Sequence, residues 1–157
     1  MATDETWRKL VHFSPLENWG NAAAIADSLL FKLDDFRGYL GTPIMVLNGT
    51  QGVHSRGSYH YLKNGACAAD IIIPDYKGTP FDLVLDATRF GFTGIGYYPH
   101  WEYKGKKANG LHLDDRPLKW DADSTLNYKH NRWMGIREEG AQVYIPLTFE
   151  NIAKYGR

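Results

Sequence analysis

Metal-binding side chains lie in three short stretches of the sequence. These are Ser58-Tyr-His60, Ala68-Ala-Asp70-Ile and Gly110-Leu-His112-Leu-Asp114-Asp115-Arg116. Two histidines and one carboxylate make a competent set of zinc ligands, because three protein ligands leave a fourth position for a water molecule whose pKa the metal lowers. The residue types alone are weak evidence, since the chain holds six histidines and 18 acidic residues.

The hydrophobic pattern predicts the elements that would position these stretches. Apolar residues recur at threes and fours over residues 29–40, which predicts a helix that ends near Gly38 or Gly41. An earlier helix start is predicted at Ser14, a capping residue followed by proline, with a restart around Asn21. A further helix is predicted over 79–90, and strands are predicted at 43–47, 67–73, 94–98, 111–113 and 144–147. Helices and strands do not alternate in strict βαβ order, so the expected class is α+β.

Composition limits the class of protein and of partner. A chain of 157 residues, 43% of them hydrophobic, has the size of one compact domain, expected to span 1–157. Basic and acidic side chains are equal in number, 18 of each, which argues against a nucleic-acid partner. No apolar run approaches the roughly 20 residues that cross a bilayer, so membrane insertion is not expected. The single cysteine, Cys67, excludes a multi-cysteine metal site, and the acidic pair Asp34-Asp35 is expected to be solvated.

Taken in order, the three stretches resemble the motifs of a known family of zinc peptidases. They are similar to Ser-x-His-x-x-Gly-x-Ala-x-Asp and the later His-x-Asp of D-Ala-D-Ala carboxypeptidases, L-alanyl-D-glutamate endolysins and the Hedgehog signalling domain. Gly94-Ile-Gly-Tyr-Tyr-Pro99 resembles the glycine-tyrosine strand that precedes the last zinc histidine, and Gly41-Thr-Pro-Ile-Met-Val46 resembles the Gly-x-Pro-Ile strand. The resemblance covers about residues 29–116.

The resemblance implies that His60, Asp70 and His112 bind Zn²⁺. It also implies a Hedgehog or DD-peptidase type of fold, in which a central mixed or antiparallel sheet is flanked by helices and holds a zinc cleft. The implied reaction is hydrolysis of an amide bond in the peptide stem of peptidoglycan, by a carboxypeptidase or an endopeptidase. The alternative is a binding or structural protein, such as a virion component, that keeps the fold without hydrolysis.

The N-terminal residues bear on where such a protein would act. Residues 1–10 mix acidic and basic side chains without an apolar segment, so no secretory signal is expected. We therefore expect synthesis in the cytoplasm and action on the cell wall later. A phage or prophage lysin released with the help of a holin, or a component of a virion, fits this expectation.

Two departures from the family pattern affect the ligands and the substrate-binding residues. The chain has about three residues more than the motif between His60 and Asp70, which a turn at 63–65 would absorb at little entropic cost; His54 is the substitute ligand if His60 is displaced. The Ser-Gly-Tyr-Arg sequence of the family is replaced by Asn48-Gly-Thr-Gln51. Substrate binding would then use Gln51, Arg56 or Arg116.

The general base is left open by the sequence. Many relatives place an acidic residue or a histidine shortly before the last zinc ligand, and residues 108–111 supply neither. Asp114 shares a strand face with His112, so it could act as the base or orient the ligand. His100 and Glu102, in the loop after the strand predicted at 94–98, are the alternatives.

Overall fold

The structure is a computed structural model of the chain, and it describes residues 1–61, 66–119 and 131–156. Its helices are α1 (Asp4–Lys9), the 3-10 turn η1 (Ala22–Ala24), α2 (Asp27–Leu40), α3 (Pro80–Arg89) and α5 (Phe149–Tyr155). Its strands are β1 (Met45–Asn48), β2 (Ala68–Ile73), β3 (Gly94–Tyr98), β4 (Glu102–Tyr103), β5 (Lys106–Lys107), β6 (Asn109–Asp114), β7 (Arg132–Glu138) and β8 (Ala141–Pro146). The expected α+β class is confirmed.

A mixed six-stranded sheet forms the centre of the fold. The strand order is β1-β2-β6-β3-β7-β8, and every neighbouring pair is antiparallel except the parallel pair β3 and β7. Strands β4 and β5 form a separate small hairpin. The metal-type residues therefore come from strands that are neighbours in the sheet although they are distant in sequence.

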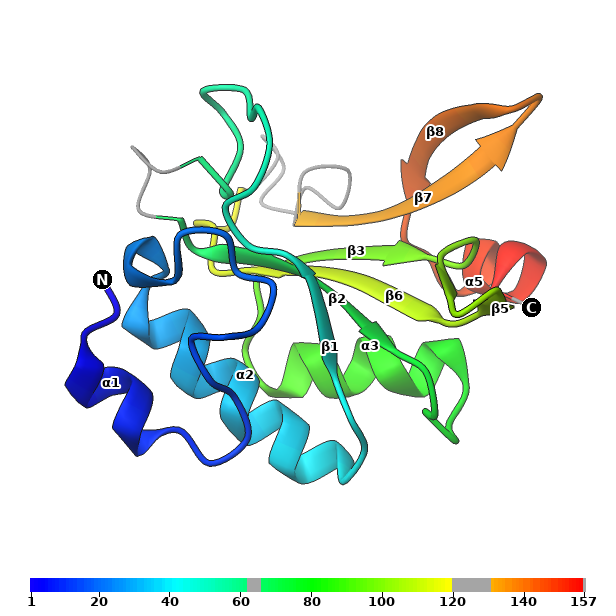
Figure 1. The fold of residues 1–157 in the computed structure, drawn as a ribbon. Helices are drawn as coiled ribbons and strands as arrows, with labels where there is room; N and C mark the ends of the chain where they lie inside the picture. The colour runs from blue at the N-terminus through cyan, green and yellow to red at the C-terminus, as the bar shows by residue number, and fades with distance from the viewer. Residues whose placement is uncertain (62–65, 120–130, 157) are drawn as a thin grey trace.

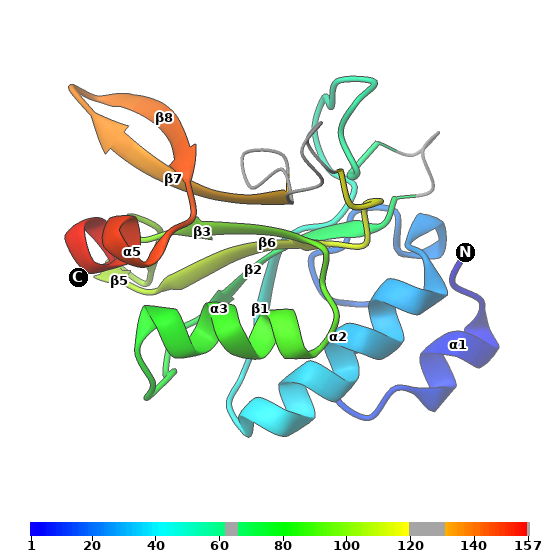
Figure 2. The same ribbon diagram turned by 180° about the vertical axis from the view of Figure 1, so that it is seen from behind.

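The two faces of the sheet have different surroundings. Helices α2 and α3 cover one face, and the β7–β8 hairpin and the loop 49–61 rise on the other side (Figures 1 and 2). The side chains of Ile71, Ile95 and Leu111 belong to one hydrophobic core with Leu30 and Leu33 of α2, and all five are fully buried. Because side chains alternate along a strand, the even-numbered neighbours of these residues face away from the helices.

Most of the elements predicted within 29–116 are present with small shifts in their ends. The helix predicted over 29–40 begins two residues earlier, at Asp27, and is terminated by Gly41 in the left-handed conformation with φ of 61°. Thr79 caps α3, and its side chain accepts from the N–H of Asp82. The strand predicted at 94–98 is confirmed, and the tail strand predicted at 144–147 overlaps β8, which begins earlier at Ala141, ends at Pro146 and lies at the edge of the sheet. The turn at 63–65 lies outside the described residues.

The helix start predicted at Ser14 is wrong, whereas the restart predicted around Asn21 matches the 3-10 turn η1, which has Asn21 at its N-cap. The first helix is α1, and Ser14 instead lies in a turn where its N–H donates to Glu17 Oε1 over 3.1 Å. The competing interaction is with Asp34, whose carboxylate accepts the N–H groups of residues 11–13. This anchors the segment to α2 in place of a helix. Asp34 is 7% exposed, so the expectation that it is a solvated charge is also wrong.

The described part of the chain holds no helix that is long and apolar enough to cross a membrane.

Gly96 provides a test of how closely side chains pack on the face opposite the helices. A Cβ atom at this position would lie 2.5 Å from Cε2 and Nε1 of Trp133, so the indole would have to move. We expect Gly96→Ala to lower the free energy of unfolding by about 1–3 kcal/mol, as overpacking does elsewhere. Urea denaturation measures the change. Gly57→Ala, which places a Cβ in open space, is the control and should be near neutral; equal midpoints for both variants would contradict the packing.

Candidate metal centre

The strand register places Asp70 and His112 side by side. They are cross-strand partners in the antiparallel pair β2 and β6, and His112 is in turn the partner of Gly96 on β3. Both side chains lie on the face opposite the helices, because Ile71 and Leu111, their neighbours in sequence, belong to the core. His60 comes from the loop 49–61 and reaches the same point.

Three donor atoms meet there. His60 Nε2 lies 3.1 Å from His112 Nδ1, His112 Nδ1 lies 2.9 Å from Asp70 Oδ1, and His60 Nε2 lies 3.4 Å from Asp70 Oδ1. His60 and His112 are buried, and Asp70 is partly exposed. The group could hold a metal ion. The structure thus brings together the three residues that the sequence nominated.

The remaining polar atoms of the three side chains have partners of their own. His60 Nδ1 lies 2.6 Å from the carbonyl oxygen of Gly49, and His112 Nε2 lies 2.7 Å from Asp114 Oδ2. Asn48 Nδ2 donates to Asp70 Oδ2 over 3.3 Å. Metal-binding histidines commonly use one ring nitrogen for the metal and the other for a carbonyl or carboxylate, which fixes the ring. The donor set and its outer partners therefore fit a metal ion.

The charges in the cluster favour a cation at its centre. Burial raises the pKa of the Asp70 carboxyl, but hydrogen bonds with His112 and His60 outweigh burial and hold that pKa well below its usual range. Burial lowers the pKa of His112, but hydrogen bonds to Asp114 and Asp70 raise it to about 9. Burial also raises the pKa of Asp114, and His112 and Arg116 together hold it low. Two ionised carboxylates thus stabilise positive charge at His112, carried by a proton or by a metal ion in its place.

An open hollow of about 450 Å³ gives access to the cluster. It is lined by the three donor residues and by a mixed set of aromatic and polar side chains: His54, Ser58, Tyr98, Arg116, Trp133 and Tyr144. A substrate in this hollow would therefore lie against the donor atoms of the cluster.

No protein-family model, curated protein or solved structure matches the chain. A function for the cluster therefore has to come from its own geometry and from the motif resemblance.

Asp114 contacts the ring nitrogen of His112 that is not part of the donor cluster, and Arg116 in turn binds Asp114. Asp114 is fully buried and accepts from the Arg116 guanidinium as well as contacting His112, so its carboxylate is fully engaged. Asp114 is not among the side chains that line the hollow, and this position favours the orienting role over the role of general base. Arg116 does line the hollow, with its guanidinium 4.7 Å from the ring centroids of both Tyr59 and Trp133.

His100 and Glu102 lie in a different hollow. That space, of about 440 Å³, is lined by both residues together with Trp101, Arg137 and others. Neither residue lines the hollow of the metal cluster. The structure therefore does not bring these two alternatives for the general base to the donor atoms, because the chain turns away at Pro99 into the β4–β5 hairpin.

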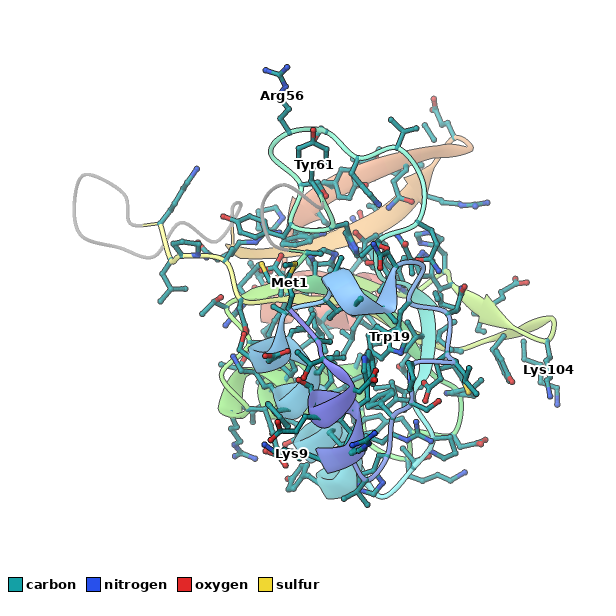
Figure 3. The ribbon with its side chains drawn as sticks, turned by 60° about the vertical axis from the view of Figure 1, so that its left-hand side comes forward. Met1, Lys9, Trp19, Arg56, Tyr61 and Lys104 are labelled. Carbon is teal, nitrogen blue, oxygen red and sulfur yellow. The ribbon has the colours of Figure 1, made fainter. Side chains whose placement is uncertain are left out.

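The predicted substrate residues in the loop 49–61 are also displaced from the hollow. Gln51 Nε2 donates to the backbone and side-chain oxygens of Asn18 and its Oε1 accepts from the N–H of Gly49, so this amide holds the loop to the N-terminal segment. Arg56 is exposed at the outer end of the loop and points away from the body of the molecule (Figure 3). Of the three predicted substrate residues, Arg116 alone lines the hollow.

His54, named from the sequence as the substitute ligand, lies beside His60 and is not one of the three clustered donors. Its ring stacks on that of His60, with centroids 5.0 Å apart and planes 17° apart, and it lines the hollow. Its Nε2 lies 2.5 Å from the carbonyl oxygen of Gln51. The segment that carries His54 has no periodicity, so only the folded loop shows that it accompanies His60 and does not replace it.

Metal binding can be tested by elemental analysis. We expect roughly one divalent ion per chain in the native protein, and loss of the ion in His60→Ala, Asp70→Ala and His112→Ala, because two donors hold a metal poorly. His100→Ala is the matched control and should keep its metal, since His100 lies in the other hollow. Metal retained in all three cluster variants, or absent from the native protein after zinc is added back, would contradict the site.

Metal binding should also release protons. Below a pH of about 9 His112 is protonated in the metal-free protein, and a metal ion needs the neutral ring. The apparent affinity should therefore rise with pH, by about tenfold per pH unit between about pH 6 and pH 8 for one released proton. Calorimetric titration with Zn²⁺ in buffers of different ionisation enthalpy counts the protons. An affinity that does not change with pH would contradict the release of a proton from His112 on metal binding.

Proposed function

We propose that the protein is a zinc peptidase of the type found in D-Ala-D-Ala carboxypeptidases, endolysins and the Hedgehog domain, acting on peptidoglycan stem peptides. The observation that supports it best is the convergence of His60 Nε2, His112 Nδ1 and Asp70 Oδ1 in an open hollow. The antiparallel pairing of the strands that carry Asp70 and His112, with helices on the opposite face, supports the proposed fold.

The spacing of the donor atoms suits zinc. Ligands about 2.0–2.1 Å from a zinc ion at tetrahedral angles lie about 3.3 Å from one another. The separations between the donor atoms, 2.9, 3.1 and 3.4 Å, are close to this value. Three protein ligands would leave one position for water on a bound zinc ion. A bound zinc ion would supply Lewis acidity, which polarises a carbonyl group and lowers the pKa of water.

His54 is the side chain best placed to move the proton. Its Nε2 contacts a carbonyl oxygen, which only accepts, so Nε2 carries a hydrogen, and in the neutral ring Nδ1 has the lone pair. Hydrolysis of an amide needs such a group to take a proton from the attacking water and return it to the leaving amine. We assign this role to His54 in place of Asp114, His100 and Glu102.

The charges at the hollow favour an endopeptidase over a carboxypeptidase. A carboxypeptidase has to bind the free carboxylate of its substrate, usually with an arginine. Among the described side chains that line the hollow, the one arginine is Arg116, and its guanidinium is bound to Asp114. Such an endopeptidase would suit the role of a phage or prophage lysin that is released with the help of a holin. It would equally suit a peptidase carried by a virion.

A second candidate is a metal-bound binding or structural protein without hydrolysis. One observation favours it: none of the three acids and bases named from the sequence lines the metal hollow. In this case the cluster would stabilise the loop 49–61 on the sheet, and the hollow would bind a ligand without cleaving it.

Release of new amino groups from purified peptidoglycan separates the two candidates. We expect the zinc-loaded protein to release them, His112→Ala to release none, and His54→Ala to keep its zinc while its rate falls by about 10²–10⁴, the usual contribution of a general base. Mass spectrometry of the products names the cleaved bond. Zinc binding without any release of amines would support the non-catalytic candidate, and a fully active His54→Ala would remove His54 from the mechanism.

A further inference from the structure

Tyr98 lies on the same face of the sheet as the metal cluster. Gly96 is the cross-strand partner of His112, and Tyr98 follows it by two residues on the same strand, so both point to the same side. The residue opposite Tyr98 is Gly110, and the absence of a side chain there lets the indole of Trp101 lie over this point of the sheet. Tyr98 lines the hollow together with His60 and the other donors.

The ring of Tyr98 is held from two directions. Trp101 stacks on it with centroids 4.2 Å apart and planes 10° apart, and Trp133 Nε1 donates to the phenol oxygen over 3.1 Å. Trp133 is itself fixed, since it lies over Gly96 and its ring is 5.1 Å from that of His112. The hydroxyl of Tyr98 is therefore held in one position in the hollow that the cluster also lines, as pre-organised catalysis requires.

The hydroxyl of Tyr98 is a donor at neutral pH. Burial raises its pKa above the ordinary value, and the nearby negative charge of Asp70 adds to this, so the phenol keeps its hydrogen. Trp133 occupies a lone pair of the oxygen, and the O–H group is hydrogen-bonded to Tyr144. Tyr144 also lines the hollow. It is 64% exposed, so a bound substrate can displace its hydroxyl from Tyr98.

We propose that Tyr98 is a catalytic residue that donates a hydrogen bond to the oxygen of the scissile carbonyl as negative charge develops on it. Water adds to the carbonyl carbon, the π electron pair moves to oxygen, and Tyr98 stabilises that oxyanion. Collapse re-forms the C=O bond and expels the amine, which takes the proton removed from the water. This inference rests on the proposed peptidase function, and it gives Tyr98 the polarising task for which the loop 49–61 provides no arginine in the hollow. Trp133 is the positioning residue for the phenol.

Tyr98→Phe tests this role in the full chain loaded with zinc. We expect kcat on peptidoglycan to fall by about 10²–10³, as after loss of one oxyanion donor, with KM changed by less than about threefold and zinc content unchanged. A phosphinate pseudopeptide that mimics the tetrahedral intermediate should bind more weakly by a similar factor, because the lost contact forms only with the oxyanion.

Tyr97→Phe is the matched control. Tyr97 is a buried tyrosine on the same strand, its ring lies in the core on the opposite face, and its hydroxyl donates to Asn109. This variant should keep wild-type kcat and wild-type phosphinate affinity. An active wild-type protein with an equally active Tyr98→Phe variant would overturn the role of Tyr98 and leave the peptidase proposal standing. A zinc-loaded wild-type protein that cleaves nothing would overturn both.

Discussion

The pairing of Asp70 with His112 across two antiparallel strands is the constraint on which the rest of the site depends. Strand register fixes both backbones, and the contact of His112 Nδ1 with Asp70 Oδ1 at 2.9 Å fixes the direction of both side chains. Asp114 then determines which ring nitrogen of His112 faces Asp70. The third donor, His60, is added from a loop and is oriented by a backbone carbonyl group. Two rigid ligands and one from a loop thus make a single cluster.

Glycines on the central strands allow bulky side chains to lie flat over this face of the sheet. A Cβ atom at Gly96 would collide with Trp133, one at Gly110 with Trp101, and one at Gly94 with Asp114. The absence of these Cβ atoms lets two indoles and the supporting carboxylate approach the backbone closely. The three glycine positions therefore leave room for the aromatic side chains and the carboxylate that pack around the hollow and orient its hydrogen-bonding groups.

The sequence predicted most strands of the region 29–116 from their local patterns, and the motif resemblance named three residues that the structure brings together. The strand at 94–98 is fully apolar or aromatic around its glycines, and His60, Asp70 and His112 form one cluster although about three extra residues separate His60 from Asp70. The sequence could not predict side-chain contacts that depend on packing between distant segments. Asp34 carries no sign that it binds the backbone of residues 11–13, and the role of His54 depends on the path of an aperiodic loop. Asp114 appeared equally suited to two roles until its burial behind His112 was known.

Anomalous scattering at the zinc absorption edge, measured on crystals of the native protein grown with zinc, tests the central claim most directly. The account predicts one strong peak about 2.0–2.2 Å from His60 Nε2, His112 Nδ1 and a carboxylate oxygen of Asp70, with a fourth position open to the hollow. A peak bound by other residues, or ligation through His112 Nε2 with Asp114 displaced, would contradict the site as described. The absence of any peak at the cluster would contradict metal binding itself.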